Sequence, residues 1–266
     1  MRELDEAAAL IAGADAVLVC AGAGMGVDSG LPDFRGDTGF WAAYPPYRRL
    51  GLSFVELADP VHFAADPALA WGFYGHRLAL YRATEPHAGF AVLRELGAAV
   101  FTSNVDGQFQ KAGFAEVAEV HGSIHHLQCL TPCSSRVWSA EDVQVTVDPE
   151  TMRAVGELPG CPSCGGLARP NILMFGDATW VPDRGQAALD ALHAWRRSAG
   201  RLAVLEIGAG KAVTTVRRMA ELASAASGAL VRINPREPEV RHGRGVGVPL
   251  GALEALTGLR ARLATA

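Results

Sequence analysis

The chain has 266 residues, enough for one large domain or a domain with a smaller module. Apolar residues make up 49% and charged residues 20%, which excludes a disordered chain. The formal net charge of -4 argues against a nucleic-acid partner, since such proteins usually carry a basic excess. The first residues are acidic and no apolar run approaches the ~20 residues of a membrane span. We therefore expect a soluble, cytoplasmic, monomeric protein with no membrane partner.

Helices and strands are expected to alternate along the chain. Residues 4–12 have helical spacing of apolar side chains, and residues 16–20 are typical of a buried strand that runs into glycines. Residues 50–81 are expected to be mostly helical, with Asp66 as N-cap and Pro67 at the first helical position. Further strands are expected at residues 98–102, 143–147, 202–207 and 229–233, and a further helix at residues 212–225. This order predicts an α/β fold with a mainly parallel sheet covered on both faces.

Four of the five cysteines form two close pairs. Cys129 and Cys133 make one pair, Cys161 and Cys164 the other, and 27 residues separate the pairs. An odd number of cysteines disfavours a disulfide framework, whereas two such pairs supply four thiolates for tetrahedral zinc. With four protein ligands the zinc would be structural. Cys20 lies inside an apolar run and is expected to be a buried small side chain.

Two of the expected strands end in glycine turns, Gly22-Ala23-Gly24 and Gly208-Ala209-Gly210. A strand, a glycine turn and a helix start together direct backbone N–H groups at a phosphate, although each turn alone could be a simple tight turn. Neither turn completes G-x-G-x-x-G, because Val27 and Val213 occupy the third position, and this disfavours a hydride-transferring dehydrogenase.

The second turn also fails as a P-loop. Leu205 and Ala212 stand where that motif needs Gly and Ser or Thr. Asn234 follows the next expected strand, at the place where a doubly wound fold meets the adenosine ribose. Asn234 could bind the ribose hydroxyls, or Asn234-Pro235 could be an ordinary turn.

Several segments, in order, resemble the signature of the sirtuin family. They are GAGMGVDSGLPDFRG at residues 22–36, TSNVDG at 102–107, VHGS at 120–123, the two cysteine pairs, RPNILMFGD at 169–177, GAG at 208–210 and IN at 233–234. The likeness covers roughly residues 10–249. The chain is therefore identified as similar to bacterial-type sirtuins, whose fold is a Rossmann-like doubly wound sheet with a small zinc-binding insert and a helical insert.

The resemblance implies an NAD-dependent protein-lysine deacylase acting on acyl-lysine proteins or peptides. Such an enzyme cleaves the nicotinamide–ribose bond and uses the acyl oxygen as nucleophile at the ribose. Asn104 and Asp106 would hold the nicotinamide ribose and its carboxamide region. His121 would take a proton from a ribose hydroxyl, which suits an imidazole whose pKa lies near neutrality. His125 and His126, close by, would have a structural or surface role.

The resemblance also implies binding residues. Phe34 would shield the reactive carbon from water. Met174, Phe175 and Gly176 would pair with the substrate backbone as an added strand, unless they form only a loop with Phe175 in the core. The implied NAD contacts are Gly22, Ala23, Gly24, Asp33, Phe34, Arg35, Ser103, Asn104, Asp106, Gly208, Ala209, Gly210, Asn234 and Val246.

Tyr74 and Arg77 are three residues apart on an expected helix and therefore share a face. This Tyr-x-x-Arg resembles the acyl pocket of sirtuins that remove succinyl and malonyl groups. A guanidinium can bind an acyl carboxylate bidentately, and a phenol can add a hydrogen bond. The alternative is a solvated arginine on an amphipathic helix.

The chain departs from the family pattern near the expected cofactor. Gly26 stands where Ser is usual, Ser103 replaces a Gln, and Ala209 and Gly210 replace hydroxyl residues. Each lost hydrogen bond would cost roughly 0.5–1.5 kcal/mol. These changes leave two other activities open on the same site: a protein ADP-ribosyltransferase or NAD hydrolase, and a non-enzymatic NAD-binding module.

The expected organisation has three parts. Residues 1–40, 85–127 and 169–266 form the Rossmann-like NAD-binding domain. Residues 41–84 form a helical module at the cofactor and the acyl pocket, and residues 128–168 form the zinc module.

Overall fold

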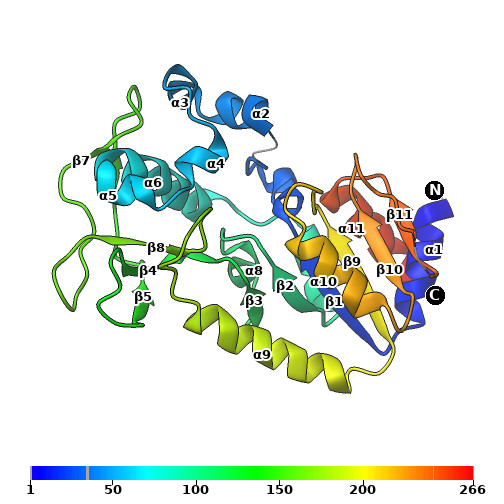
Figure 1. Cartoon of the computed structure of the whole chain (residues 1–266). Helices are drawn as coiled ribbons and strands as arrows, with labels where there is room; N and C mark the ends of the chain where they lie inside the picture. The colour runs from blue at the N-terminus through cyan, green and yellow to red at the C-terminus, as the bar shows by residue number, and fades with distance from the viewer. Residues whose placement is uncertain (1, 34–35, 242, 266) are drawn as a thin grey trace.

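The computed structural model describes residues 2–33, 36–241 and 243–265. Its centre is a six-stranded sheet in the order β11-β10-β9-β1-β2-β3 (Figure 1). Every neighbouring pair in this sheet is parallel. The parallel sheet expected from the sequence is thus confirmed. The strands are β1 (Ala16–Ala21), β2 (Ala99–Thr102), β3 (Val117–Glu119), β9 (Leu202–Ile207), β10 (Leu230–Ile233) and β11 (Val246–Val248).

Helices cover both faces of the sheet, because the side chains of each strand alternate between two apolar cores. In β1, Val17 and Val19 face one core, whereas Leu18 and Cys20 face the other. The first core is completed by α1 (Arg2–Ala12), α7 (Gly89–Glu95), α8 (Gln108–Lys111) and α11 (Ala252–Leu263). The second is completed by α9 (Asp183–Ser198) and α10 (Thr215–Ser224). Cys20 is fully buried, as expected.

Five helices lie between residues 36 and 83. They are α2 (Gly36–Ala43), α3 (Pro45–Arg49), α4 (Phe54–Leu57), α5 (Val61–Ala65) and α6 (Pro67–Ala83). The longest, α6, begins as the sequence predicts: the Asp66 side chain accepts a hydrogen bond from the backbone N–H of Leu69, and Pro67 is the first helical residue.

The cysteine-containing segment forms its own small sheet. Strands β4 (Gly122–Cys129), β5 (Val137–Ser139) and β8 (Ala168–Ile172) are antiparallel in the order β5-β4-β8. A separate hairpin joins β6 (Thr146–Val147) to β7 (Ala154–Val155). A third core, rich in aromatic side chains, joins this segment to the helical module.

Two expected elements are shorter than the sequence suggested. The strand expected at residues 143–147 is wrong except at 146–147, because Val143 and Val145 pack against the third core instead of continuing the ladder. The helix expected at residues 212–225 begins only at Thr215, since the preceding residues form the loop after Gly210. Among residues 2–33, 36–241 and 243–265, no helix has the length and apolar character of a membrane span.

Candidate active site

The two glycine turns lie side by side at the carboxyl ends of β1 and β9. The backbone N–H of Gly24 donates to the carbonyl of Gly208 at 3.0 Å. A Cβ at Gly24 would lie 2.6 Å from the Cα of Gly208, and one at Gly22 would lie 2.9 Å from the Cα of Ala209. Gly208 also has a φ of +64°. These contacts require glycine, and they build a side-chain-free edge that fits a pyrophosphate.

Asn234 lies beside these turns at the end of β10. Its side chain is fully buried, donates to the carbonyl of Ala209 at 2.9 Å, and accepts from the backbone N–H groups of Arg236 and Glu237. Asn234 therefore orders the turn in this structure, and its contact with a ribose remains a prediction. Val246 lies elsewhere: it is buried opposite Val231, two residues before the end of β11.

Arg217 on α10 connects the turn at Ala209 to the loop at Glu237, and no local pattern in the sequence indicates this role. Its guanidinium donates to the carbonyl of Ala209 at 3.0 and 3.2 Å and to the carbonyl of Glu237 at 2.9 Å. Its Nη2 also lies 3.3 Å from a carboxylate oxygen of Glu237. Ala209 and Gly210 carry no hydroxyl groups, so their own side chains cannot hold the turn by hydrogen bonds. The charged hydrogen bonds from Arg217, here called the Arg217 clamp, hold it instead.

The segment after β2 reaches the first glycine turn. The Asn104 amide donates to the carbonyl of Gly22 at 3.0 Å, and the Ser103 N–H donates to the carbonyl of Ala21 at 3.3 Å. Asp106 is buried, and its carboxylate accepts from the Gln108 N–H at 2.9 Å. Burial raises the pKa of Asp106 to about 6. Asn104 and Asp106 are thus held at the same edge as the glycine turns.

His121 directly precedes β4 and is joined to the Asn104–Asp106 segment through that strand. The Ile124 N–H donates to the carbonyl of Val105, and Nε2 of His125 donates to the carbonyl of Asp106, both at 2.9 Å. Burial lowers the pKa of the half-buried His121 below its ordinary value. The imidazole is therefore neutral at pH 7 and able to accept a proton. His125 has the structural role expected.

Gly26 and Asp33 follow the first glycine turn in the chain. Asp33 is half-buried, whereas Phe34 and Arg35 lie outside the described residues. The Leu31 side chain packs over Gly26, and a Cβ at Gly26 would lie 3.1 Å from it.

The loop after β8 connects His121 to the helical module. The Leu173 N–H donates to the carbonyl of His121 at 2.9 Å, and the Phe175 N–H donates to the carbonyl of Ala58 at 3.0 Å. Phe175 is 39% exposed and Met174 is buried, so the alternative that places Phe175 in the core is wrong.

A fully buried ion pair closes this loop. Arg169 and Asp177 lie 2.8 Å apart, and the Asp177 carboxylate also accepts from the Met174 N–H at 3.4 Å. Gly176 lies between the fixed residues. No local pattern in the sequence indicates this pair, because only the fold brings the two residues into a dry environment.

Tyr74 and Arg77 lie inside the aromatic core of the helical module. Their exposed fractions are 1% and 6%, which excludes the solvated arginine considered as an alternative. The Arg77 guanidinium lies 5.1 Å from the ring centre of Phe73 and 5.6 Å from that of Tyr74. It also donates to the Tyr81 hydroxyl at 2.8 and 3.0 Å. A cation held among aromatic rings can attract a carboxylate.

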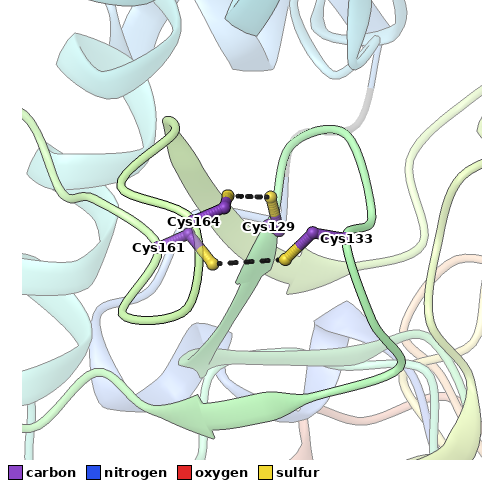
Figure 2. Close-up of side chains that lie close together, drawn as sticks. All are labelled: Cys129, Cys133, Cys161 and Cys164. Carbon is purple, nitrogen blue, oxygen red and sulfur yellow. Dashed lines mark hydrogen bonds between the residues drawn. The ribbon is translucent and has the colours of Figure 1, made fainter.

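The four paired cysteines converge, as Figure 2 shows. The Sγ atoms of Cys129 and Cys164 are 3.6 Å apart, those of Cys133 and Cys161 are 3.7 Å apart, and all four lie within 4.8 Å of one another. Zn–S bonds of ~2.3 Å in a tetrahedron give S···S distances of about 3.8 Å. The spacing of three residues between Cys129 and Cys133 is therefore compatible with a zinc site.

Comparisons with known proteins agree with this geometry. The Sir2 family model matches residues 22–194. The chain is 35% identical over 241 residues to NAD-dependent protein deacylase 1 of Pseudomonas aeruginosa, covering 88% of the chain and 89% of that protein. It is 30% identical over 240 residues to an NAD-dependent protein deacylase of Pyrococcus abyssi, covering 88% of each. It is also similar to a crystal structure of a Sir2 homologue–NAD complex, with a TM-score of 0.75, 27% identity, and coverage of 97% of this chain and 93% of that one.

Proposed function

The chain belongs to the Sir2 family, and we propose that it is an NAD-dependent protein-lysine deacylase. One observation carries the proposal: hydrogen bonds connect the glycine edge to the Asn104–Asp106 segment, and that segment to β4, which begins next to His121. The proposed nucleotide-binding edge and the proposed proton acceptor would thus belong to one continuous site. A simple NAD-binding module would not require the second part.

NAD would supply an electrophilic ribose carbon and nicotinamide as the leaving group. The glycine turns would bind the pyrophosphate through backbone N–H groups. Asn104 would orient the nicotinamide ribose, because its amide is fixed by the carbonyl of Gly22. Asp106 would lie beside the positive charge that develops on the sugar, and ionising its carboxyl requires a pH above about 6.

His121 would then act as the general base. Its neutral imidazole would accept the proton of a ribose hydroxyl, which makes that oxygen nucleophilic toward the acyl carbon. With the acyl oxygen bonded to the ribose carbon in place of nicotinamide, and with one water molecule consumed, the acyl group would move from lysine to ADP-ribose and the lysine amine would be released. The loop of Met174, Phe175 and Gly176, held by the Arg169–Asp177 pair, would present the acyl-lysine backbone to this site.

Cys129, Cys133, Cys161 and Cys164 would hold a structural zinc ion. All four ligands come from the protein, so the metal has no open position for substrate. Its role would be to fix β4, which begins next to His121 and ends at Cys129.

We further propose that the acyl pocket prefers succinyl- or malonyl-lysine. Arg77 is buried and permanently charged, and Tyr74 adjoins it on the same helix. A carboxylate on the acyl chain would be drawn to this cation in surroundings of low polarity, where the attraction is strong. An acetyl group has no carboxylate and would not be stabilised by this attraction.

The deacylase proposal is tested by incubating the protein with NAD, with and without acyl-lysine peptide. Nicotinamide release that requires the peptide and yields O-acyl-ADP-ribose supports it. Release without peptide, or ADP-ribose attached to protein, would identify an NAD hydrolase or an ADP-ribosyltransferase. No release under any condition would leave only an NAD-binding module.

The acyl preference is tested with succinyl and acetyl forms of one peptide. Arg77→Met should lower kcat/KM for the succinyl form at least tenfold, because a hydrogen bond to a charged group contributes about 1.5–3 kcal/mol. The acetyl form should change less than threefold. Unchanged succinyl turnover would refute the preference while leaving the deacylase proposal intact.

A further inference from the structure

Helix α6, which carries Tyr74 and Arg77, has a glycine face formed by Gly72 and Gly75. The two residues are three apart and therefore adjacent on the helix surface. A Cβ at Gly72 would overlap the carbonyl oxygen of Met152. A Cβ at Gly75 would lie 2.7 Å from both Cβ and Cγ1 of Val145. Glycine in a helix interior destabilises the helix by about 1 kcal/mol relative to alanine. At Gly72 and Gly75 this cost allows another element to approach the helix closely.

The approaching element is residues 140–155, which include the β6–β7 hairpin; Figure 1 shows β7 beside α5 and α6. At the start of the helix, Arg153 Nη2 lies 2.5 Å from Oδ1 of Asp66, the residue that caps α6. At its other end, Arg82 donates to the carbonyl of Val143 at 2.7 Å. Polar contacts therefore attach this segment to both ends of the helix.

The middle of the contact is fixed by backbone geometry. The Tyr47 hydroxyl donates to the carbonyl of Met152 at 3.0 Å, and Met152 has a φ of +53°. Among the described residues, Met152 is the one non-glycine residue with positive φ. That conformation is sparsely populated by L residues, so the surrounding contacts hold it in place. The carbonyl of Met152 thereby points at the position where Gly72 leaves room.

The same segment is tied to the cysteine cluster. It lies within the 27 residues between Cys133 and Cys161, whose Sγ atoms are 3.7 Å apart. A metal bound by the four cysteines would close this loop at its base, while the glycine face of α6 holds its tip. The position of α6 then depends on a segment outside the helical module.

We propose that the β6–β7 hairpin is a positioning element for acyl-lysine binding. By docking on Gly72 and Gly75 it fixes α6, and with it the place of Tyr74 and Arg77 in the acyl pocket. The proposal rests on the deacylase function and adds a determinant of acyl-chain binding that lies in the zinc module. Gly72 and Gly75 act through the helix and touch no substrate.

The test uses the zinc-loaded full chain and four variants. Gly75→Ala should raise KM for the acyl-peptide at least fivefold, with kcat and the KM for NAD within twofold. Val145→Leu adds bulk at the same contact from the hairpin side and should act in the same direction. The double variant Gly75→Ala with Val145→Gly removes both clashing atoms of residue 145 and should return KM to within twofold of the parent. Ala79→Gly, on the exposed face of α6, is the control for helix propensity alone and should leave KM unchanged.

Hydrogen exchange of residues 143–155 provides a second readout that needs no catalysis. Exchange should be faster in Gly75→Ala and Val145→Leu, and normal in the double variant and in Ala79→Gly. Unchanged KM and exchange in both clashing variants would overturn the proposal, as would failure of the double variant to restore them or an equal effect of Ala79→Gly. If the parent released no nicotinamide with any acyl-peptide, the deacylase function would fail instead, and the exchange pattern would still report whether the hairpin docks.

Discussion

The two ends of the site are built in different ways. At the nucleotide end, backbone turns from parallel strands meet directly, and Gly24 and Gly208 are needed because nothing larger fits between them. At the end that we propose binds the acyl group, here called the acyl end, side chains from separate segments form an aromatic core around Arg77. Glycine serves opposite purposes at these ends. In the turns it exposes backbone toward a ligand, whereas in α6 it admits another part of the protein.

This difference has a consequence for stability. The parallel sheet has its own apolar cores on both faces, and these cores contain none of the four clustered cysteines. The acyl end shares one core with the cysteine-containing segment. Damage to the zinc module should therefore reach the acyl pocket before it reaches the nucleotide edge.

Metal removal should produce the largest effect. A chelator should release the segment between the cysteine pairs, since structural zinc contributes on the order of 10 kcal/mol to small metal-bound folds. We expect hydrogen exchange to rise throughout residues 122–172 while β1 and β9 remain protected. Equal loss of protection in both regions would show that the two ends are not independent.

His121→Ala should remove the general base. Acyl-peptide-dependent product formation should fall about 10²- to 10⁴-fold, the usual contribution of such a group. The Kd for NAD should change less than threefold, because the glycine turns and Arg217 remain. His126→Ala is the matched control on the adjoining strand and should retain activity. A large rise in the Kd for NAD in His121→Ala would contradict the separation of the two ends.

Asp106→Asn should stabilise the protein at neutral pH while lowering its activity. The pKa of Asp106 is about 6 in the folded protein and 3.8 in the unfolded chain. The protonated carboxyl therefore contributes its full stabilisation of the folded state below pH 3.8, and this contribution is lost as the pH rises through 6. The variant does not ionise and should gain up to about 3 kcal/mol over the parent above pH 6. Urea unfolding of both proteins between pH 5 and 8 measures this. A stability difference that did not grow with pH would show that burial does not penalise this carboxylate.

Arg217→Met should act at the nucleotide end alone, with the smallest effect. Losing the clamp on the carbonyls of Ala209 and Glu237 should raise the Kd for NAD about tenfold, the equivalent of one charged hydrogen bond. Acyl-peptide KM at saturating NAD should stay within twofold. The neighbouring exposed residue supplies the control, Arg218→Met, which should leave the Kd unchanged. An equal rise in the Kd for NAD in both variants would show that the effect comes from losing a positive charge and not from losing the hydrogen bonds of Arg217.

The sequence was informative where chemistry is local. The alternation of buried strands with helices predicted the parallel sheet, and two cysteine pairs predicted a cluster that the structure brings together. Segments such as residues 102–107 and 120–123 also identified residues that the fold places at one edge.

Contacts between distant segments could not be predicted in this way. Arg217 and the Arg169–Asp177 pair look like ordinary surface charges until the fold buries them. Gly72 and Gly75 look like weak points in a helix until residues 140–155 lie against them. The strand expected at residues 143–147 failed for the same reason, since its valines pack on another module.

The central claim is tested most directly by the stoichiometry of a single reaction. With NAD and an acyl-lysine peptide, mass spectrometry should show one nicotinamide and one O-acyl-ADP-ribose for each lysine freed, and no product when either substrate is omitted. Nicotinamide release independent of the peptide, or deacylation without NAD, would contradict the account.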